Sequence, residues 1–269
     1  MLMFASDLDR TLIYSERALT EFRQIENDDL IGVERKDEQD VAFMSKKSFE
    51  SLLEITKKML FVPVTTRTSV QYNRIHILTE TIPLTYAVTS NGANIFHNGA
   101  PLLEWNRHVR KRLEIECASL AEMTAVIKTY NIEGLLKIAD NLFFYFLLEK
   151  GIDLDTVKSI KEMASKYGWR ISIQGRKLYF MPMPISKGEA VKFIKARESI
   201  NTAFGAGDSL LDDDFLRQCD YSFVPSHGEL AKEENINKQY IITKKWGVKA
   251  GEEILLEINE MAKNRIYSG

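Results

Sequence analysis

Two carboxylates lie one residue apart near the start of the chain, at Asp7 and Asp9. They follow the apolar run 2–6, which has the length and composition of a short buried strand. Open α/β sheets bind ligands at the carboxyl edge of their strands, so both acids would lie at such an edge. Two carboxylates held this close repel each other unless a cation or a shared proton offsets their charge. We therefore expect the chain to supply further acids for a metal, and cationic or hydroxyl groups for an anionic substrate.

Three further stretches place polar residues directly after an apolar run or at the start of a helix. The run 60–64 is followed by Thr65, and a predicted amphipathic helix begins at Lys187. Another apolar run is followed by Asp208 and Asp212. These two acids lie four residues apart, so both can project from one face of a helix that begins just after Asp208.

Together these side chains supply the groups that phosphoryl transfer requires. The set holds a carboxylate nucleophile, a second carboxylate for proton transfer, a hydroxyl and an ammonium for the phosphate, and further acids for a metal. Mg²⁺ suits this set, because it prefers a few carboxylates, water and a phosphate oxygen to soft ligands. Thr65 alone could equally be a helix cap, so the interpretation depends on the whole set.

Apolar strand-like runs alternate with helical segments over most of the chain. The expected strands are 2–6, 60–64, 86–89, 201–206 and 220–224. This alternation is typical of a doubly wound, mostly parallel α/β sheet with a Rossmann-type core. The other elements expected of this core are hairpins at 30–44 and at Asn94–Phe96 with Leu102–Leu103, helices at 46–59, from Lys187 and at 247–263, and a strand at 240–243.

The pattern changes between residues 104 and 182. Two helical segments are followed by two strands, one helix and two more strands, which is an αα-ββ-α-ββ order. This order predicts an antiparallel sheet with helices on one face, inserted into the βα alternation. We therefore expect an inserted α+β domain at 104–182, and a core formed by 1–103 and 183–269.

The ordered motifs resemble those of the haloacid dehalogenase-like (HAD) phosphatase superfamily. The residues that carry this resemblance are Asp7-Leu8-Asp9-Arg10-Thr11, Thr65, Lys187 and Gly207-Asp208-Ser209-Leu210-Leu211-Asp212. Asn91-Gly92-Ala93, with an α/β insert before the lysine, resembles the Cof-type branch that includes sucrose-phosphate phosphatases. The resemblance spans nearly the whole chain, and its specificity comes from the ordered set and not from any single motif.

The resemblance implies a role for each matching acid. Asp7 would be the nucleophile that becomes an aspartyl-phosphate, and Asp9 the acid that protonates the leaving oxygen and later activates water. Mg²⁺ would bind to Asp7, to the backbone carbonyl of Asp9 and to Asp208, with support from Asp212. These assignments make the expected reaction a Mg²⁺-dependent hydrolysis of a phosphomonoester.

The phosphate and the rest of the substrate would meet other residues. In the resemblance, Thr65 and Lys187 hold the transferring phosphate, and the insert selects the substrate, a small phosphorylated metabolite such as a sugar phosphate or a nucleotide-like compound. Candidate substrate-binding residues are Thr11, Thr66, Arg67, Asn91 and Arg10. Three residues depart from the usual motifs. Arg10 stands where Gly or Asn is common, Thr66 where Gly is common, and Leu211 where Asn is common. Arg10 could meet a second anionic group of the substrate or pair with a nearby acid, while Arg67 could reach the site or stay solvated.

Composition limits the partners and the compartment. The 269 residues carry a net charge of -2, which gives no general reason to expect nucleic acid or an anionic membrane as a partner. The two cysteines have no metal-binding spacing, and no run of 18 apolar residues occurs. We expect a cytoplasmic protein, either a monomer or a weak dimer.

Two other functions remain open at the level of sequence. A phosphomutase would use the same aspartyl-phosphate and return the phosphoryl group to a sugar. A non-catalytic protein that binds a metabolite or a partner could keep the fold without the chemistry, although the complete set of acids argues against it. His227, alone in a loop, is expected to be structural or exposed and not part of the site.

Overall fold

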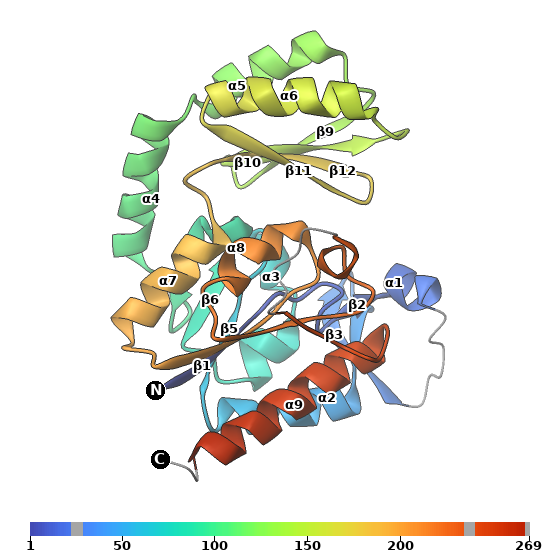
Figure 1. Cartoon of the computed structure of the whole chain (residues 1–269), viewed down its shortest axis with the longest axis vertical. Coiled ribbons are helices and arrows are strands. Elements are labelled where there is room, and N and C mark those ends of the chain that lie inside the picture. Colours follow the sequence, from blue (N-terminus) through green and yellow to red (C-terminus); the bar gives the residue numbers. More distant parts are fainter. Residues whose placement is uncertain (23–28, 234–239, 267–269) are drawn as a thin grey trace. The chain divides into compact units, whose positions relative to one another are not determined.

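The computed structural model describes residues 1–22, 29–233 and 240–266. The chain divides into two compact units, which we call the core (Met1–Ala100 and Lys187–Gly269) and the cap (Pro101–Ser186). The sequence prediction places these limits at 103/104 and 182/183. In Figure 1 the cap is the green and yellow part of the chain.

Among the described residues, the core is built on a five-stranded sheet with the order β15-β14-β13-β1-β5. All neighbouring strands in it are parallel. The predicted parallel sheet is therefore confirmed, but the strand expected at 86–89 belongs to a separate sheet, which is joined to this one by an isolated parallel bridge between Val64 and Val88. The strands of the five-stranded sheet are β1 (Leu2–Ser6), β5 (Leu60–Pro63), β13 (Thr202–Ala206), β14 (Tyr221–Val224) and β15 (Ile241–Ile242).

The register of this sheet brings several strand ends to a common edge. Ser6, at the end of β1, lies opposite both Ala206 and Pro63. The N–H of Asp7 donates to the carbonyl of Ala206 at 2.8 Å, and the N–H of Val64 donates to that of Ser6 at 2.7 Å. Side chains that follow β1, β5 and β13 therefore meet at the edge where α/β sheets bind ligands.

Helices cover both faces of the core sheet, as a doubly wound fold requires. α2 and α9 pack together on one face, and α7 and α8 lie on the other (Figure 1). No helix in the part of the chain that the structure describes is long and apolar enough to cross a membrane. The core helices are α1 (Glu16–Glu21), α2 (Lys46–Thr56), α3 (Ser69–Tyr72), α7 (Lys187–Arg197), α8 (Asp213–Leu216) and α9 (Val248–Ile266).

Alternation along β13 shows how the two faces are packed. Phe204 belongs to the hydrophobic cluster on the side of α2 and α9. Gly205 faces the other side of the sheet, where the C-terminal end of α8 lies. A Cβ added to Gly205 would lie 2.8 Å from the sulfur of Cys219 and 3.0 Å from Leu216. The missing side chain therefore lets α8 approach the sheet closely.

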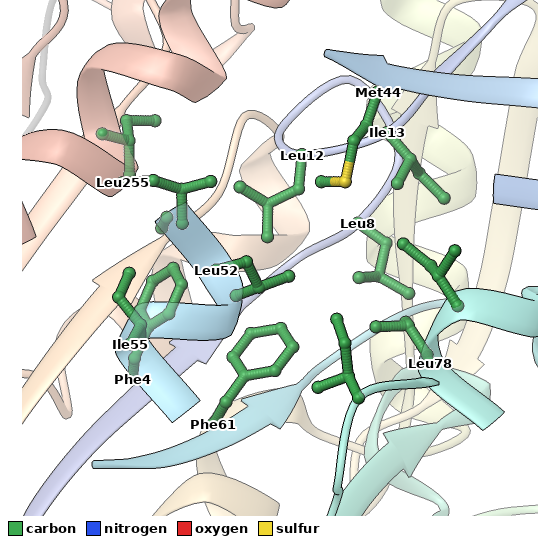
Figure 2. Close-up of a cluster of buried hydrophobic side chains, with 14 of the residues drawn as sticks. Phe4, Leu8, Leu12, Ile13, Met44, Leu52, Ile55, Phe61, Leu78 and Leu255 are labelled. Atoms are coloured by element: carbon green, nitrogen blue, oxygen red, sulfur yellow. The ribbon is translucent and has the colours of Figure 1, made fainter. Parts of the chain in front are cut away.

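A large hydrophobic cluster holds β1 in place (Figure 2). Phe4 of β1 and Phe61 of β5 stack with their ring centroids 5.4 Å apart. Leu52 of α2 and Leu255 of α9 belong to the same cluster, and both are buried. Burying a side chain of this size contributes about 1.5–3 kcal/mol, so the cluster fixes the strand that carries the first acids of the site.

Two smaller three-stranded sheets are also present in the described residues. One has the order β2-β4-β3 and contains the predicted hairpin at 30–44, and the other has the order β6-β7-β8. Their strands are β2 (Tyr14–Ser15), β3 (Leu30–Lys36), β4 (Gln39–Ser45), β6 (Tyr86–Thr89), β7 (Asn94–His97) and β8 (Ala100–Pro101). Single turns of π or 3₁₀ helix are η2 (Ile77–Thr81), η3 (Ser90–Gly92), η5 (Leu210–Asp212) and η6 (Leu230–Lys232).

The sequence prediction misplaces the second arm of the hairpin that follows β6. The arm is Ala100–Pro101 and not Leu102–Leu103. Asn98 and Gly99 have φ values of 49° and 76°, as a two-residue hairpin turn requires, so the returning strand begins directly after Gly99. Leu103 is instead the first residue of a helix.

The cap is a four-stranded antiparallel sheet with the order β11-β12-β10-β9. Helices α5 and α6 cover one face of it (Figure 1). The rings of Phe144 and Phe180 stack there at 4.7 Å, and the indole N–H of Trp169 donates to the carbonyl of Ala118 at 2.8 Å. The predicted αα-ββ-α-ββ order is confirmed. Its elements are α4 (Leu103–Glu116), α5 (Leu120–Ile127), η4 (Lys128–Tyr130), β9 (Gly134–Ala139), β10 (Phe143–Leu148), α6 (Leu154–Lys166), β11 (Trp169–Gln174) and β12 (Lys177–Pro182).

Truncating a side chain of the core cluster should destabilise the protein. Leu52 is 1% exposed, so Leu52→Ala leaves a cavity and is expected to lower the free energy of unfolding by about 2–5 kcal/mol. Val70→Ala on α3 is the control, because Val70 is 74% exposed and should change stability by less than about 0.5 kcal/mol. Urea unfolding followed by fluorescence measures both. Equal shifts of the two midpoints would contradict this role of the cluster.

Candidate active site

Asp7 lies at the carboxyl end of β1 and forms a buried ion pair with Lys187. The ammonium Nζ of Lys187 donates to Oδ1 of Asp7 at 2.7 Å and to Oδ1 of Asp212 at 2.6 Å. Lys187 is 1% exposed, so nearly all its charge is compensated by these acids and not by water. Its position depends on Gly188, where a Cβ would lie 2.4 Å from the carbonyl oxygen of Asp214.

Asp208 joins Asp7 and Asp212 in one cluster. One carboxylate oxygen from each of the three lies within 4.8 Å of the others. The sequence predicts that Asp208 and Asp212 project from one face of a helix. This prediction is wrong, because Asp208 lies before the first helical turn. The backbone N–H and the hydroxyl of Ser209 both donate to Oδ2 of Asp212 at 2.9 Å, and this capping box makes η5 a single 3₁₀ turn that Asp208 precedes. α8 begins only at Asp213.

The electrostatics of this cluster fit a divalent cation. Burial raises the pKa of Asp7 to about 7 against the opposing effect of Lys187, with further increases from Asp212 and Asp9. Burial raises the pKa of Asp208 well above its ordinary value, and the charges of Asp7 and Asp212 add to this. The ammonium of Lys187 therefore contacts two of three buried carboxylates, and the third, Asp208, has Arg10 at 3.8 Å. Such a set of hard oxygen donors with excess negative charge suits a hard divalent cation, which Asp7 and Asp208 would hold with Asp212 in support.

The residues after β5 form a second wall of this edge. The backbone N–H of Thr65 donates to the carbonyl of Val88 at 2.9 Å, and its own carbonyl accepts from the N–H of Asn91 at 3.0 Å. Ser90 and Asn91 have φ values of 51° and 58°, so a left-handed turn brings Asn91 against Thr65. Both Thr65 and Asn91 are fully buried. The hydroxyl of Thr65 accepts a hydrogen bond from the N–H of Arg67 at 3.1 Å, which closes the loop.

Arg67 connects this loop to Asp9. Its Nε and Nη2 donate to the two carboxylate oxygens of Asp9 at 2.7 and 2.8 Å, and its Nη1 lies 2.8 Å from Oε2 of Glu34. Burial alone would lower the pKa of Arg67, but Asp9 and Glu34 together raise it above its ordinary value. Arg67 therefore stays charged and lies beside Asp9, for which the resemblance implies a role in proton transfer.

Two threonines complete the predicted set. Thr11 is fully buried, and its hydroxyl oxygen has no hydrogen-bond partner among the described residues. Thr66 is partly buried in the loop between β5 and α3. The substrate-binding roles predicted for Thr11, Thr66, Arg67 and Asn91 stay predictions.

Comparison with known proteins places this geometry in a recognised fold. No protein-family model matches the sequence, and a search of curated proteins finds no match. Solved structures do match over nearly the full length. The sucrose-phosphatase from Synechocystis sp. PCC6803, in complex with sucrose and phosphate, has a TM-score of 0.68 at 11% identity and covers 98% of both chains.

Two further matches are phosphatases of the HAD superfamily. The subclass IIB sugar phosphatase BT4131 has a TM-score of 0.63 at 10% identity and covers 97% of this chain and 100% of that one. BT1666 from Bacteroides thetaiotaomicron has a TM-score of 0.56 at 12% identity, with coverages of 97% and 95%. The chain shares the fold of these phosphatases. At these identities the likeness establishes the fold, and any activity has to be argued from the side chains.

Arg10 takes an unusual backbone conformation in this HAD fold. Its φ is 64°, in the left-handed region where glycine is favoured, which gives a physical reason for the Gly that the resemblance leads one to expect there. Its guanidinium pairs with both carboxylate oxygens of Glu21 at 3.0 and 2.9 Å and lies over the ring of Phe22. Its Nε also lies 3.8 Å from Asp208. Arg10 therefore pairs with nearby acids, and a role in substrate binding stays a prediction.

His227 holds this strained residue in place. The N–H of Gly247 donates to Nδ1 of His227 at 3.1 Å, so the ring proton lies on Nε2, which donates to the carbonyl of Arg10 at 2.7 Å. The ring is 3% exposed and packs against Phe22 and Trp246. Burial lowers the pKa of His227 to about 4, which keeps it neutral and preserves this pattern of donors. The structural role expected of His227 agrees with these contacts.

Three supporting residues escaped the sequence prediction. Glu34, Glu21 and Ser209 hold Arg67, Arg10 and Asp212 respectively. The capping-box spacing of Ser209 and Asp212 is a local signal that could have been used. Glu34 and Glu21 carry no such signal. Arg67, the partner of Glu34, is distant in sequence, and the fold orients Arg10 toward Glu21.

The protonation of His227 predicts an acid-sensitive contribution to stability. The pKa of His227 is lower in the folded than in the unfolded state, so between about pH 6.5 and 4 the unfolded chain binds a proton that the folded chain does not. The wild type should lose up to about 3 kcal/mol through this group as the pH falls. His227→Gln can keep both hydrogen bonds without titrating, so its stability relative to wild type should rise from pH 7 to pH 4.5 in denaturant unfolding. Parallel pH profiles would rule out this contribution.

Proposed function

We propose that this protein is a Mg²⁺-dependent phosphatase that hydrolyses a phosphomonoester through an aspartyl-phosphate on Asp7. The single observation that carries the proposal is the buried cluster in which Lys187 lies between Asp7 and Asp212, with Asp208 beside them. A buried carboxylate next to a fixed ammonium and to acids for a metal can meet a phosphate dianion that it would otherwise repel. The full-length likeness to HAD phosphatases supports the same reading.

The nucleophilic step belongs to Asp7. Its carboxylate oxygen attacks phosphorus, and the bond between phosphorus and the leaving oxygen breaks. Lys187 fixes the carboxylate through Oδ1 and supplies positive charge, while Thr65 offers its hydroxyl to the transferring phosphoryl group. When bound, Mg²⁺ would offset the charge of the carboxylates and of the phosphate oxygens.

The proton transfers belong to Asp9. It gives a proton to the leaving oxygen in the first step, and in the second it takes a proton from water as this water attacks phosphorus. The bond between phosphorus and Asp7 then breaks, inorganic phosphate leaves and the carboxylate is restored. The side chain of Asp9 is 45% exposed, which is compatible with exchange of this proton with solvent.

The substrate that we propose is a small phosphorylated metabolite, either a sugar phosphate or a nucleotide-like compound. Support comes from the sucrose-phosphatase match, whose structure holds sucrose and phosphate. In this proposal the cap selects the substrate, Thr11, Thr66, Asn91 and Arg10 bind it, and Arg67 holds Asp9. The protein would act in the cytoplasm, with nucleic acid and membranes playing no part.

Replacing the nucleophile should abolish turnover. Asp7→Asn keeps the size of the side chain and removes the attacking charge, so release of inorganic phosphate from every member of a panel of sugar, nucleotide and polyol phosphates should fall by at least about a hundredfold. Asp220→Asn, at an acid of the same unit that pairs with Lys195, is the matched control and should keep its activity. Full turnover by Asp7→Asn would refute the mechanism. Transfer to a second hydroxyl of the sugar, without release of phosphate, would indicate a mutase.

Metal removal gives a test that does not depend on knowing the substrate. Mg²⁺ binds the folded and not the unfolded chain, so at about one hundred times its Kd it should stabilise the protein by about 2.7 kcal/mol. Thermal unfolding in chelator and after addition of Mg²⁺ measures this shift, which Asp208→Asn should remove. Turnover should be lost in chelator and restored by Mg²⁺. If neither the melting temperature nor the activity of the wild type changes with Mg²⁺, the proposed metal site is excluded.

A further inference from the structure

Glu34 is a buried acid at an irregular point of strand β3. The pairing of β3 with β4 shifts register between Gly32 and Glu34 and again between Glu34 and Arg35. Such bulges turn a side chain away from the regular alternation of a strand. Glu34 is only 3% exposed, although Arg35, which follows it, is exposed. The bulge therefore carries a carboxylate into the interior, where it requires a partner.

Two arginines from another part of the chain supply that partner. Oε2 of Glu34 lies 2.8 Å from Nη1 of Arg67, and Oε1 lies 3.0 Å from Nη2 of Arg74. The backbone supports the same contact, since the N–H of Arg35 donates to the carbonyl of Arg74 at 3.0 Å. The β3–β4 hairpin is thus joined to the segment after β5 by side-chain and backbone contacts together.

Arg67 passes this contact on to Asp9. A guanidinium is planar, and here Nη1 faces Glu34 while Nε and Nη2 face the two oxygens of Asp9. Fixing one edge of the plane therefore fixes the orientation of the carboxylate on the other. Arg67 is the buried member of its pair with Asp9, at 13% exposure against 45%, so the arginine sets the position of the acid and not the reverse.

We propose that Glu34 is a positioning residue, which through Arg67 orients the carboxylate of Asp9 for proton transfer to the leaving oxygen. The inference rests on the proposed phosphatase function. Each oxygen of Asp9 accepts a hydrogen bond from Arg67, and a carboxylate oxygen has two lone pairs, so this pairing is compatible with a proton on Asp9 that moves to the leaving oxygen as its bond to phosphorus breaks. The hairpin at 30–45 is then part of the catalytic apparatus, although Glu34 itself does not touch the substrate.

Leaving-group dependence separates this role from a general loss of structure. An alkyl phosphate needs its leaving oxygen protonated, whereas an aryl phosphate with an acidic phenol leaves with little help. Because kcat/KM reports the first irreversible step, Glu34→Gln should lower kcat/KM for an alkyl phosphate by about tenfold or more and change that for p-nitrophenyl phosphate by less than about twofold. Glu252→Gln, which removes an equally buried acid paired with Lys249 on α9, should change neither.

Two further variants make the test decisive. Arg67→Lys keeps the charge without the planar fork, so it should give the same leaving-group-dependent loss even where Glu34→Gln folds poorly. In an Asp9→Asn background, Glu34→Gln should cause no additional loss for the alkyl phosphate. An equal loss for both substrates, or a full additional loss in the Asp9→Asn background, overturns the proposal.

A measurement without substrate distinguishes this inference from the proposed function. The Nε–H proton of Arg67, identified by its absence in Arg67→Lys, should give a resolved NMR signal in the wild type and in Glu252→Gln. This signal should shift or vanish in both Glu34→Gln and Asp9→Asn. An unchanged signal in Glu34→Gln overturns the proposed coupling whatever the activity. The wild type could instead hydrolyse no phosphomonoester while the Arg67 signal still responds to Glu34→Gln and Asp9→Asn. That result overturns the phosphatase function, and with it the proton-transfer role of Glu34.

Discussion

The site depends on one buried interaction, the ammonium of Lys187 between the carboxylates of Asp7 and Asp212. Each of these groups would be costly to bury alone, and their mutual attraction offsets that cost only at hydrogen-bond distance. They come from β1, the start of α7 and η5, which lie far apart in sequence. The parallel register of β1 with β13 therefore has a chemical consequence, because a slip of one residue would turn Asp7 to the opposite face.

Three residues of the loops at the same edge carry backbone strain. Arg10, Ser90 and Asn91 all have positive φ, a conformation that costs a non-glycine residue about 1–2 kcal/mol. Each is held by contacts from elsewhere, such as the hydrogen bond from His227 to Arg10 and that from Asn91 to Thr65. Strain that is stabilised from outside is common at functional sites, where loops have to present particular atoms to a ligand. Here the strained residues flank the acids, while the strands that carry those acids are regular.

The sequence predicts those parts of the protein that depend on local signals. Compact apolar runs indicate the parallel strands, and Asn98-Gly99 specifies a hairpin turn by its chemistry, although the position of the returning arm was misjudged. The gathering of Asp7 and Asp208 follows from strand ends sharing one edge, and Lys187 joins them from the start of α7. The side chains around them could not be predicted, because their roles depend on long-range contacts. His227 meets Arg10 across 217 residues, and Glu34 points inward only because β3 is bulged.

Glu34 also shows why stability alone does not explain this arrangement. Replacing a buried ion pair by apolar side chains of similar volume is often neutral or stabilising, so the Glu34–Arg67 pair is weak evidence for a contribution to folding. Apolar packing cannot fix the orientation of a carboxylate. A guanidinium that is bound along two edges can do so, because it holds its carboxylate partner in its own plane. The bulge in β3 disrupts regular pairing with β4 and, in return, fixes the orientation of Asp9. A hairpin that lies outside the central sheet is in this way connected to the acid on which proton transfer would depend.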